Sequence, residues 1–310
     1  MQFRFKDNTM RKYPAVRIFF RNYAAPYLFI APFFVLFLIF QFVPMIWSFW
    51  LSFHQWNGLG SARFIALDNY SMLFRDSMFK DALSNTFFYW FFSLLIVIPL
   101  SFIMALLLAQ GGLKNKKIYQ IFLFIPHITA SVAAGLVFAI LFDDRGFINQ
   151  VLGFLRFSPV PWLTGTTFSK IPVLILIIWR NAPWHMMIIY SALISINPEL
   201  YEAAFIDGAS AFRRFFSITI PCIAPILFFC AIILSIESWR IFNEPYVLTK
   251  GGPGSSSLSL VQYMYENGFR IFKMGYASTI GYALTAILLI ISIAQTSLLR
   301  KQGDGFRGAL

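Results

Sequence analysis

Residues 199–221 read ELYEAAFIDGASAFRRFFSITIP. This stretch holds three acids, two arginines and a glycine, yet the runs on either side of it, Ile171–Ile196 and Ile218–Phe242, are strongly apolar. Each run is long enough to cross a hydrocarbon layer of about 30 Å, for which a helix needs roughly 20 residues. A compact polar segment between two such runs is expected at the membrane surface, joining two spans.

The whole chain has the composition of a membrane protein. Of its 310 residues, 58% are hydrophobic and only 12% are charged, which is unlike a soluble domain. The apolar runs do not alternate with polar residues, so they predict helices rather than a barrel. The first run is too long for the core of a signal peptide. We predict an all-α polytopic bundle of about six transmembrane helices, at Tyr27–Trp50, Phe87–Ala109, Ile118–Phe142, Ile171–Ile196, Ile218–Phe242 and Tyr276–Leu299.

The Lys and Arg residues between these runs predict the orientation of the bundle. With the N-terminus inside, the inner segments hold fourteen of them and the longer outer segments hold nine, as the positive-inside rule requires. We therefore expect both termini in the cytoplasm. The predicted division is a cytoplasmic segment 1–26, a transmembrane domain 27–299 with an inner loop 197–217, and a cytoplasmic tail 300–310.

Several classes of function are disfavoured by what the chain contains. The net charge of +12 comes from residues beside predicted membrane ends, so nucleic acid is not an expected partner. Cys222 and Cys230 lie eight residues apart in one predicted helix, about 12 Å along its axis, which is too far for a disulfide. The sequence has no Walker A motif, no metal-ligand spacing and no nucleophile elbow, so we expect no catalytic residue and no metal. Any ATP must bind to another subunit.

The polar stretch itself predicts a helix, a turn and a second helix. Asn197 is suited to cap a helix that begins at Pro198, with acidic residues in its first turns. Gly208 favours a left-handed stop, and Ser210 can cap the second helix. Tyr201, Phe205 and Phe212 are spaced to share one side. Such an element could dock in a groove of a partner or pack under its own bundle, and periodicity does not separate the two.

The residues Glu202, Ala203, Ala204, Asp207 and Gly208, followed by Ile220 and Pro221, resemble the EAA loop of permease subunits in bacterial binding-protein-dependent ABC importers. Other segments are similar to the carbohydrate-importer branch, the maltose and glycerol-phosphate type, and occur in its order. They are DNYSMLF (68–74), LSNTFFY (83–89), FIPHITASVAAGLVFAILFDDRGFINQVL (124–152), PWL (161–163) and VLTKGGPG (247–254). Together they cover most of residues 20 to 300.

The resemblance implies the partners and the role of the loop. Residues 202–208 would form a coupling helix docked on an ATPase subunit. The chain itself would bind no cofactor, with ATP and Mg on the partner ATPase dimer. A second homologous permease and an extracytoplasmic sugar-binding protein would complete the importer, in the lipid of a bacterial inner membrane.

Polar side chains within the predicted spans suggest a substrate pathway, because such groups need partners or water. Its candidate residues are Arg180, Asn181, Trp184, His185, Glu237 and Asn243. Aromatic faces at Trp184 and Trp239 could cover a sugar ring. The alternative is a structural ion pair of Glu237 with Arg180 or Arg240, with both tryptophans at the membrane interface.

The remaining loops carry weaker signals. Residues 54–84 predict short amphipathic helices, and residues 143–170 predict one short helix in irregular structure. For LTKGGPGSSSLS we favour a flexible linker, and for Pro126 and His127 a kinked helix. Two other functions compete with import driven by ATP. They are an ion-coupled secondary transporter of a small polar solute, which usually shows an internal repeat, and a membrane enzyme that uses His185 and Glu237.

Overall fold

The computed structural model describes residues 15–110 and 114–307, and it confirms a helical membrane fold. Five of its helices are long and apolar enough to cross a membrane, or six if one sharply bent pair is counted as a single span. The predicted terminal segments lie partly outside the described residues. The elements, in chain order, are α1 (Ala15–Phe37), a π-helical turn (Leu38–Phe42), α2 (Val43–Ser52), β1 (His54–Gln55), β2 (Arg63–Phe64), α3 (Asp68–Arg75), α4 (Ser77–Ala109), α5 (Lys116–Ile128), α6 (Ser131–Leu141), α7 (Phe147–Phe154), α8 (Lys170–Ile194), α9 (Pro198–Ile206), α10 (Ala211–Arg214), a π-helical turn (Phe215–Thr219), α11 (Ile220–Trp239), α12 (Asn243–Leu248), α13 (Leu260–Tyr265), a π-helical turn (Glu266–Arg270) and α14 (Met274–Arg307).

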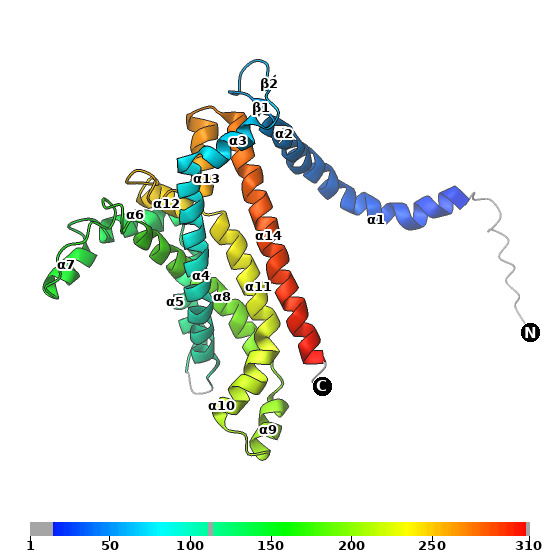
Figure 1. The fold of residues 1–310 in the computed structure, drawn as a ribbon. Coiled ribbons are helices and arrows are strands. Elements are labelled where there is room, and N and C mark those ends of the chain that lie inside the picture. The colour runs from blue at the N-terminus through cyan, green and yellow to red at the C-terminus, as the bar shows by residue number, and fades with distance from the viewer. Residues whose placement is uncertain (1–14, 111–113, 308–310) are drawn as a thin grey trace, which may run out of the picture.

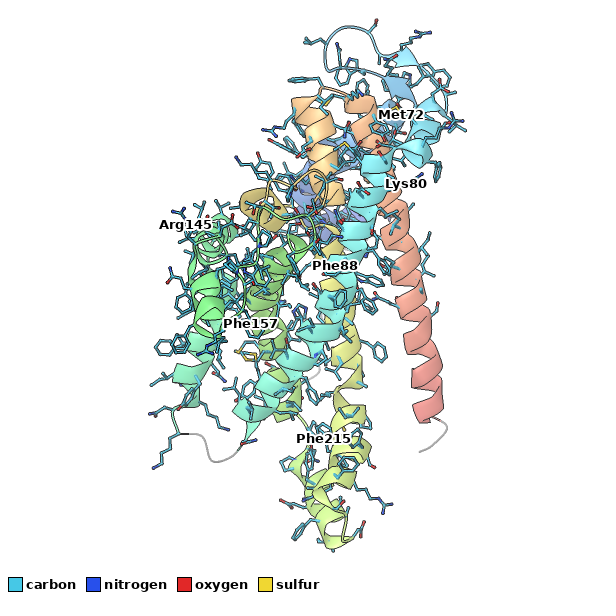
Figure 2. All side chains as sticks on the ribbon, turned by 60° about the vertical axis from the view of Figure 1, so that its left-hand side comes forward. Met72, Lys80, Phe88, Arg145, Phe157 and Phe215 are labelled. Atoms are coloured by element: carbon cyan, nitrogen blue, oxygen red, sulfur yellow. The ribbon has the colours of Figure 1, made fainter. Side chains whose placement is uncertain are left out.

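The bundle has two distinct ends (Figure 1). At one end lie α9 and α10, together with the ends of α4 and α14, and we call it the hairpin end. At the other lie the short antiparallel pair β1–β2, α3 and α13, and we call it the loop end. Figure 2 shows the same division, with Phe215 at the hairpin end and Met72 and Lys80 at the loop end. Three of the predicted inner segments, the one after α4, the loop 197–217 and the described end of α14, therefore share the hairpin end, whereas the start of α1 lies away from it.

The centre of the bundle is formed by α4 packed against α8 and α11. Small residues of α4, including Ala105 and Ser101, are fully buried there, which allows close helix approach. The Ser101 hydroxyl donates to the carbonyl of Ala182 at 2.8 Å. The Trp90 indole and the Gln295 amide both donate to the Ser235 hydroxyl, at 2.9 and 2.8 Å. These hydrogen bonds tie four helices together in the apolar interior.

The first span extends away from this bundle (Figure 1). Almost every described side chain from Pro26 to Trp50 is exposed at the surface of the single chain, and these residues are apolar. A helix that is apolar on all sides needs lipid or another protein around it. The first span therefore contributes little to the core, which is built by the later helices.

The third predicted span is not the continuous helix that we expected over Ile118–Phe142. It consists of α5 and α6, which are bent by 89° at Thr129 and Ala130. The expected kink at Pro126 is therefore a sharp break located after it. His127 lies beside the break, where its Nδ1 is 3.2 Å from the carbonyl oxygen of Arg180 in α8. Its ring also stacks on Trp184 at a centroid distance of 5.0 Å.

The predictions for the outer loops are mostly confirmed, with one correction. The amphipathic segments appear as α3 and as the first turns of α4, and the single short helix in residues 143–170 is α7. The segment LTKGGPGSSSLS is not a flexible linker, because polar groups of α4 hold it. The Asn85 amide donates to the carbonyls of Ser255 and Leu258, at 2.7 and 3.0 Å, and the Tyr89 hydroxyl donates to that of Ser257 at 3.0 Å.

One carboxylate organises the loop end. Asp76 caps α4 by accepting from the backbone N–H groups of Met78 and Phe79, at 2.9 and 3.3 Å. It also accepts hydrogen bonds from the hydroxyls of Tyr263 and Tyr276. Partial burial works to raise the pKa of Asp76, but these four hydrogen bonds outweigh it and hold the pKa below its usual value. Burial and the bond to Asp76 raise the pKa of Tyr263 to about 12, so it remains a donor.

We expect Asp76→Asn to lower the thermal stability of the purified protein. An amide cannot accept all four bonds, and the cost is about 2 kcal/mol, or about 3 °C in Tm for a chain of this size. A depressed carboxyl pKa adds stability above the unfolded value of about 3.9 and loses it as the pH falls through the folded value. The difference in Tm between wild type and variant should thus be constant from pH 8 to 5 and shrink below pH 4. Scanning fluorimetry of both proteins at several pH values measures this, and an unchanged Tm at neutral pH would contradict it.

Candidate functional site

The polar stretch forms a projecting helical hairpin, made of α9, a turn and α10. Both predicted caps are present. The Asn197 side chain accepts from the N–H of Glu199 at 3.1 Å, and the Ser210 hydroxyl accepts from the N–H of Arg213 at 3.2 Å. Pro198 occupies the first helical position, as predicted. The hairpin is fixed by local sequence signals and lies directly between the membrane helices α8 and α11.

The turn of the hairpin depends on Gly208. Its φ is +73°, in the left-handed region that glycine adopts without steric cost. The N–H of Ala209 donates to the carbonyl of Ala204 at 2.9 Å, and the N–H of Gly208 donates to that of Phe205 at 3.0 Å. This pair of bonds is the Schellman arrangement, which satisfies the last carbonyls of a helix. The predicted left-handed stop is confirmed at the predicted residue.

The hairpin presents an apolar and acidic surface rather than packing under its own bundle. Phe205, Ile206 and Phe212 are 68%, 83% and 74% exposed. Of the residues predicted for coupling, Glu202, Ala203, Asp207 and Gly208 are also exposed, and Ala204 is half-buried. Large apolar side chains left in the open at the tip of a helical hairpin indicate a contact surface for another protein.

The prediction that Tyr201 shares one side of the hairpin with Phe205 and Phe212 was wrong. This residue is half-buried, and its hydroxyl lies 2.8 Å from the Thr219 hydroxyl, at the start of α11. The polar tip of Tyr201 has a partner on the returning chain, so the ring turns inward and braces the hairpin. Arg214 also braces it, since its guanidinium carbon lies 5.5 Å from the Phe205 ring centroid.

The predicted substrate-pathway residues surround an ion pair that was not predicted. Arg180 of α8 donates from Nη1 to Oε1 of Glu244 in α12 at 2.6 Å, with side chains that are 21% and 11% exposed. Neither of the alternatives, Glu237 with Arg180 or with Arg240, forms within the described part of the chain.

Glu244 was missed because span five was extended to Phe242. In the structure α11 ends at Trp239 and α12 begins at Asn243. The sequence did contain one indication of this pair, because a charged residue within a span, such as Arg180, needs a partner.

The other residues of α8 divide between two environments. His185 is fully buried, and its Nδ1 lies 3.0 Å from the carbonyl oxygen of Asn181. Its Nε2 has no partner within the described residues. Trp184 is 39% exposed and faces α5, where it stacks on His127. Asn181 is half-buried. The structure therefore separates His185, which is in the core, from Arg180, Asn181 and Trp184, which are accessible.

On the side of α11 and α12, Glu237 and Asn243 are both exposed. Trp239 lies neither at the membrane interface nor in an open pathway, because it is 2% exposed in a core cluster and packs near Trp90 at a centroid distance of 6.1 Å. The chain turns at Arg240–Phe242, and this turn directs Trp239 into the bundle. Of the two candidate residues on α11, Glu237 and Trp239, only Glu237 is therefore exposed enough to contact a substrate.

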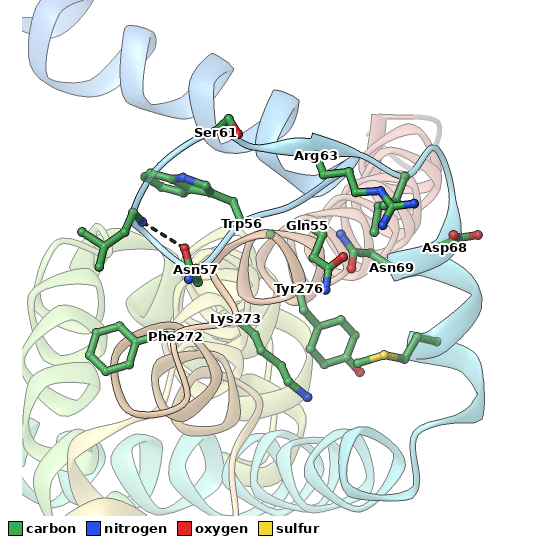
Figure 3. A pocket seen from close by; sticks show the side chains of 14 residues that line it. Gln55, Trp56, Asn57, Ser61, Arg63, Asp68, Asn69, Phe272, Lys273 and Tyr276 are labelled. Carbon is green, nitrogen blue, oxygen red and sulfur yellow. Dashed lines mark hydrogen bonds between the residues drawn. The ribbon is translucent and has the colours of Figure 1, made fainter.

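A separate hollow of about 760 Å³ lies at the loop end (Figure 3). It is bounded by the β1–β2 hairpin, α3 and the start of α14, and its lining includes Trp56, Arg63, Asp68 and Lys273. The Trp56 indole N–H donates to the carbonyl of Gly60 at 3.1 Å, which fixes the rim of the hollow. None of the predicted site residues lines it.

Comparison with known proteins identifies the family. Residues 78–302 match the family described as "Binding-protein-dependent transport system inner membrane component". The chain belongs to this family. Membership confirms the resemblance drawn from residues 199–221 and from the motifs around them. It also confirms that the chain is an integral membrane component of a transport system.

Similar proteins extend over nearly the whole chain. The arabinooligosaccharides transport system permease protein AraP of Bacillus subtilis is 34% identical over 284 residues, which are 91% of this chain and 90% of that protein. The lactose transport system permease protein LacF of Rhizobium radiobacter is 31% identical, over 87% of this chain and 92% of that one. A solved bacterial alginate ABC transporter, in complex with a pentasaccharide-bound periplasmic protein, has a chain with a TM-score of 0.79 and 25% identity. The match covers 91% of this chain and 96% of that one.

Proposed function

We propose that this chain is the permease subunit of an ATP-driven importer that carries a carbohydrate into the cell. The observation that carries the proposal is the exposed hairpin α9–α10 in a member of the binding-protein-dependent transport family. The named cargoes of similar proteins, arabinooligosaccharides and lactose, support a saccharide as the cargo. An ion-coupled secondary transporter has no feature in the described residues that favours it over import driven by ATP.

In this proposal the hairpin end faces the cytoplasm, together with both chain termini. The distribution of Lys and Arg supports this orientation. An ATPase dimer that binds ATP and Mg would hold the exposed residues around Glu202 and Gly208. A second, homologous permease would complete the pathway in the membrane. An extracytoplasmic saccharide-binding protein would dock at the loop end, which lies opposite the hairpin. The presence of a periplasmic protein in the alginate transporter complex supports such a partner.

The hairpin would act as a lever because it joins two helices of the proposed pathway. It is continuous with α8, which carries Arg180, and with α11, which carries Glu237. The Tyr201–Thr219 contact braces it against α11. Movement of the hairpin, when the ATPase subunits close, would therefore shift both sides of the pathway together. A rigid connection of this kind couples a contact at the membrane surface to opening of the interior.

The test is ATPase activity and uptake by the reconstituted importer, with a panel of saccharides on its binding protein. Wild type should be stimulated by at least one saccharide. Glu202→Lys reverses an exposed charge on the hairpin. We expect it to lower uptake about tenfold or more, the effect of losing roughly 1.4 kcal/mol of contact energy, while the protein inserts normally.

Two results would count against the proposal. Normal uptake by Glu202→Lys would remove the coupling role of the hairpin. Uptake that needs no ATPase and follows a proton or sodium gradient would replace ATP-driven import with secondary transport. The charges of the pathway would then carry the coupling ion.

A further inference from the structure

The ion pair between Arg180 and Glu244 determines which saccharides the pathway accepts. From its geometry we infer that the cargo is an uncharged saccharide, and that acidic saccharides are rejected. This inference rests on the proposed function and narrows its substrate class. It follows from three features of the described residues: the occupied charge of Arg180, the excess of carboxylates around it, and the amide and aromatic groups nearby.

The cationic group of the pathway is already occupied. Arg180 donates from Nη1 to the Glu244 carboxylate at 2.6 Å, a short bond between two charged groups that are both largely buried. An anionic cargo would have to displace Glu244 from Arg180. That exchange would leave the Glu244 carboxylate without its partner in a site where it is 11% exposed, which is strongly unfavourable. Recognition of anions by proteins normally uses an arginine whose N–H groups are free for two parallel bonds. In Arg180, Nη1 is engaged by Glu244, and Nε, which has no partner within the described residues, is buried. Neither pair of neighbouring N–H groups is therefore open to a ligand.

The remaining charges do not favour an anion. Glu237 is exposed on α11 and takes part in no ion pair within the described residues. Arg180, Glu237 and Glu244 together carry a formal charge of −1. Arg240, which directly follows α11 and is exposed, brings this sum only to zero. An acidic saccharide would therefore meet no surplus of positive charge along this part of the pathway.

The same groups suit hydroxyls. A sugar hydroxyl both donates and accepts, and so does the side-chain amide of each accessible asparagine, Asn181 and Asn243. The carboxylate of Glu237 can accept from a hydroxyl at an exposed position. Trp184 is 39% exposed, and the part of its ring that is not covered by His127 can contact the apolar face of a sugar. These contacts bind a polyhydroxylated ligand without needing a charge on it.

The test compares neutral and acidic oligosaccharides of equal length on the assembled importer in nanodiscs. Binding of maltotriose and arabinotriose, and of trigalacturonate, is measured directly by equilibrium dialysis without the binding protein, so that its own selectivity does not enter. For wild type we expect at least one neutral trisaccharide to bind about tenfold or more tightly than trigalacturonate, the preference that one unfavourable charge interaction gives.

The variant Glu244→Gln frees Arg180 and removes one negative charge. It should raise the affinity for trigalacturonate about tenfold and leave the best neutral ligand within about threefold. The double variant Arg180→Gln/Glu244→Gln removes both charges and leaves neither buried alone. It should show no gain in affinity for trigalacturonate over wild type, because the gain in Glu244→Gln depends on the freed Arg180. An equal gain in both variants would overturn the inference. Asp68→Asn, the same change at the loop end, should behave as wild type.

Equal or tighter binding of trigalacturonate by wild type would overturn the inference and leave the proposed import of saccharides intact. An unchanged ratio in an assembled Glu244→Gln importer would also overturn it. If no saccharide binds at all and none stimulates the ATPase, both the proposed function and the inference about uncharged saccharides fail. The dialysis and ATPase measurements together therefore distinguish the two failures.

Discussion

Replacing Gly208 with valine is expected to abolish most of the uptake while the protein still reaches the membrane. Gly208 has a φ of +73°, and a residue with a Cβ pays about 1–2 kcal/mol there, with β-branched side chains the least tolerant. The added Cβ itself would meet no atom within 4 Å, so the cost comes from the backbone alone. The turn must change its geometry, and the two bonds that close it, from Ala209 to Ala204 and from Gly208 to Phe205, would be lost.

The effect on transport follows from the place of this turn. If the hairpin docks on an ATPase, displacing its tip removes the contact surface around Glu202 and Phe205. We expect uptake to fall about tenfold or more, since each 1.4 kcal/mol of lost contact is a factor of ten. Uptake and membrane insertion are measured on the same cells. Gly208→Asn is the control, because asparagine tolerates the left-handed conformation and should retain most activity. Equal loss of uptake in Gly208→Val and Gly208→Asn would show that the backbone conformation at residue 208 does not cause the loss.

The hairpin could be predicted from the sequence because its signals are local. Asn197, Gly208 and Ser210 each satisfy backbone groups within a few residues of themselves, so their roles follow from the order of residue types. The membrane spans are equally predictable, since an apolar run of about 20 residues has few alternatives. Family motifs then supplied the expectation that the hairpin couples to an ATPase, and this remains a prediction.

The rest depends on contacts between segments that lie far apart in the chain. Arg180 finds Glu244, which is 64 residues away, and periodicity within either helix contains no trace of this pairing. The loop after α12 is rich in glycine and serine, which suggests flexibility, yet Asn85 and Tyr89 of α4 supply hydrogen bonds that fix it. Trp239 was expected either against a sugar ring or at the membrane interface, and neither position is correct, because the ring is buried against other helices where α11 ends. Such tertiary partners override local propensity.

The loop end should fail to form when Gly275 is replaced by alanine. Gly275 lies in the first turn of α14, directly against the strand β1. A Cβ on this residue would overlap the carbonyl oxygen of His54 and stand 3.0 Å from that of Leu51. Backbone atoms of both segments are involved, so no side-chain rotation can relieve the overlap. The helix would have to move away from β1 and break the bond from the N–H of Met274 to the carbonyl of Trp56.

The cost should be about 3 kcal/mol or more, from overpacking together with the lost backbone bonds. For a chain of this size that corresponds to a fall in Tm of about 5 °C, measured by scanning fluorimetry of the purified protein. Gly281→Ala, two turns further along α14, is the matched control. Its Cβ would lie 3.2 Å from the sulfur of Met264, a flexible side chain that can move aside, so its Tm should stay close to that of wild type. A similar Tm for both variants would mean that α14 does not approach β1 this closely. In that event the first and last spans would be held together mainly further along α14, where the Thr279 hydroxyl donates to the carbonyl of Ser52 and the Tyr282 hydroxyl donates to that of Met45.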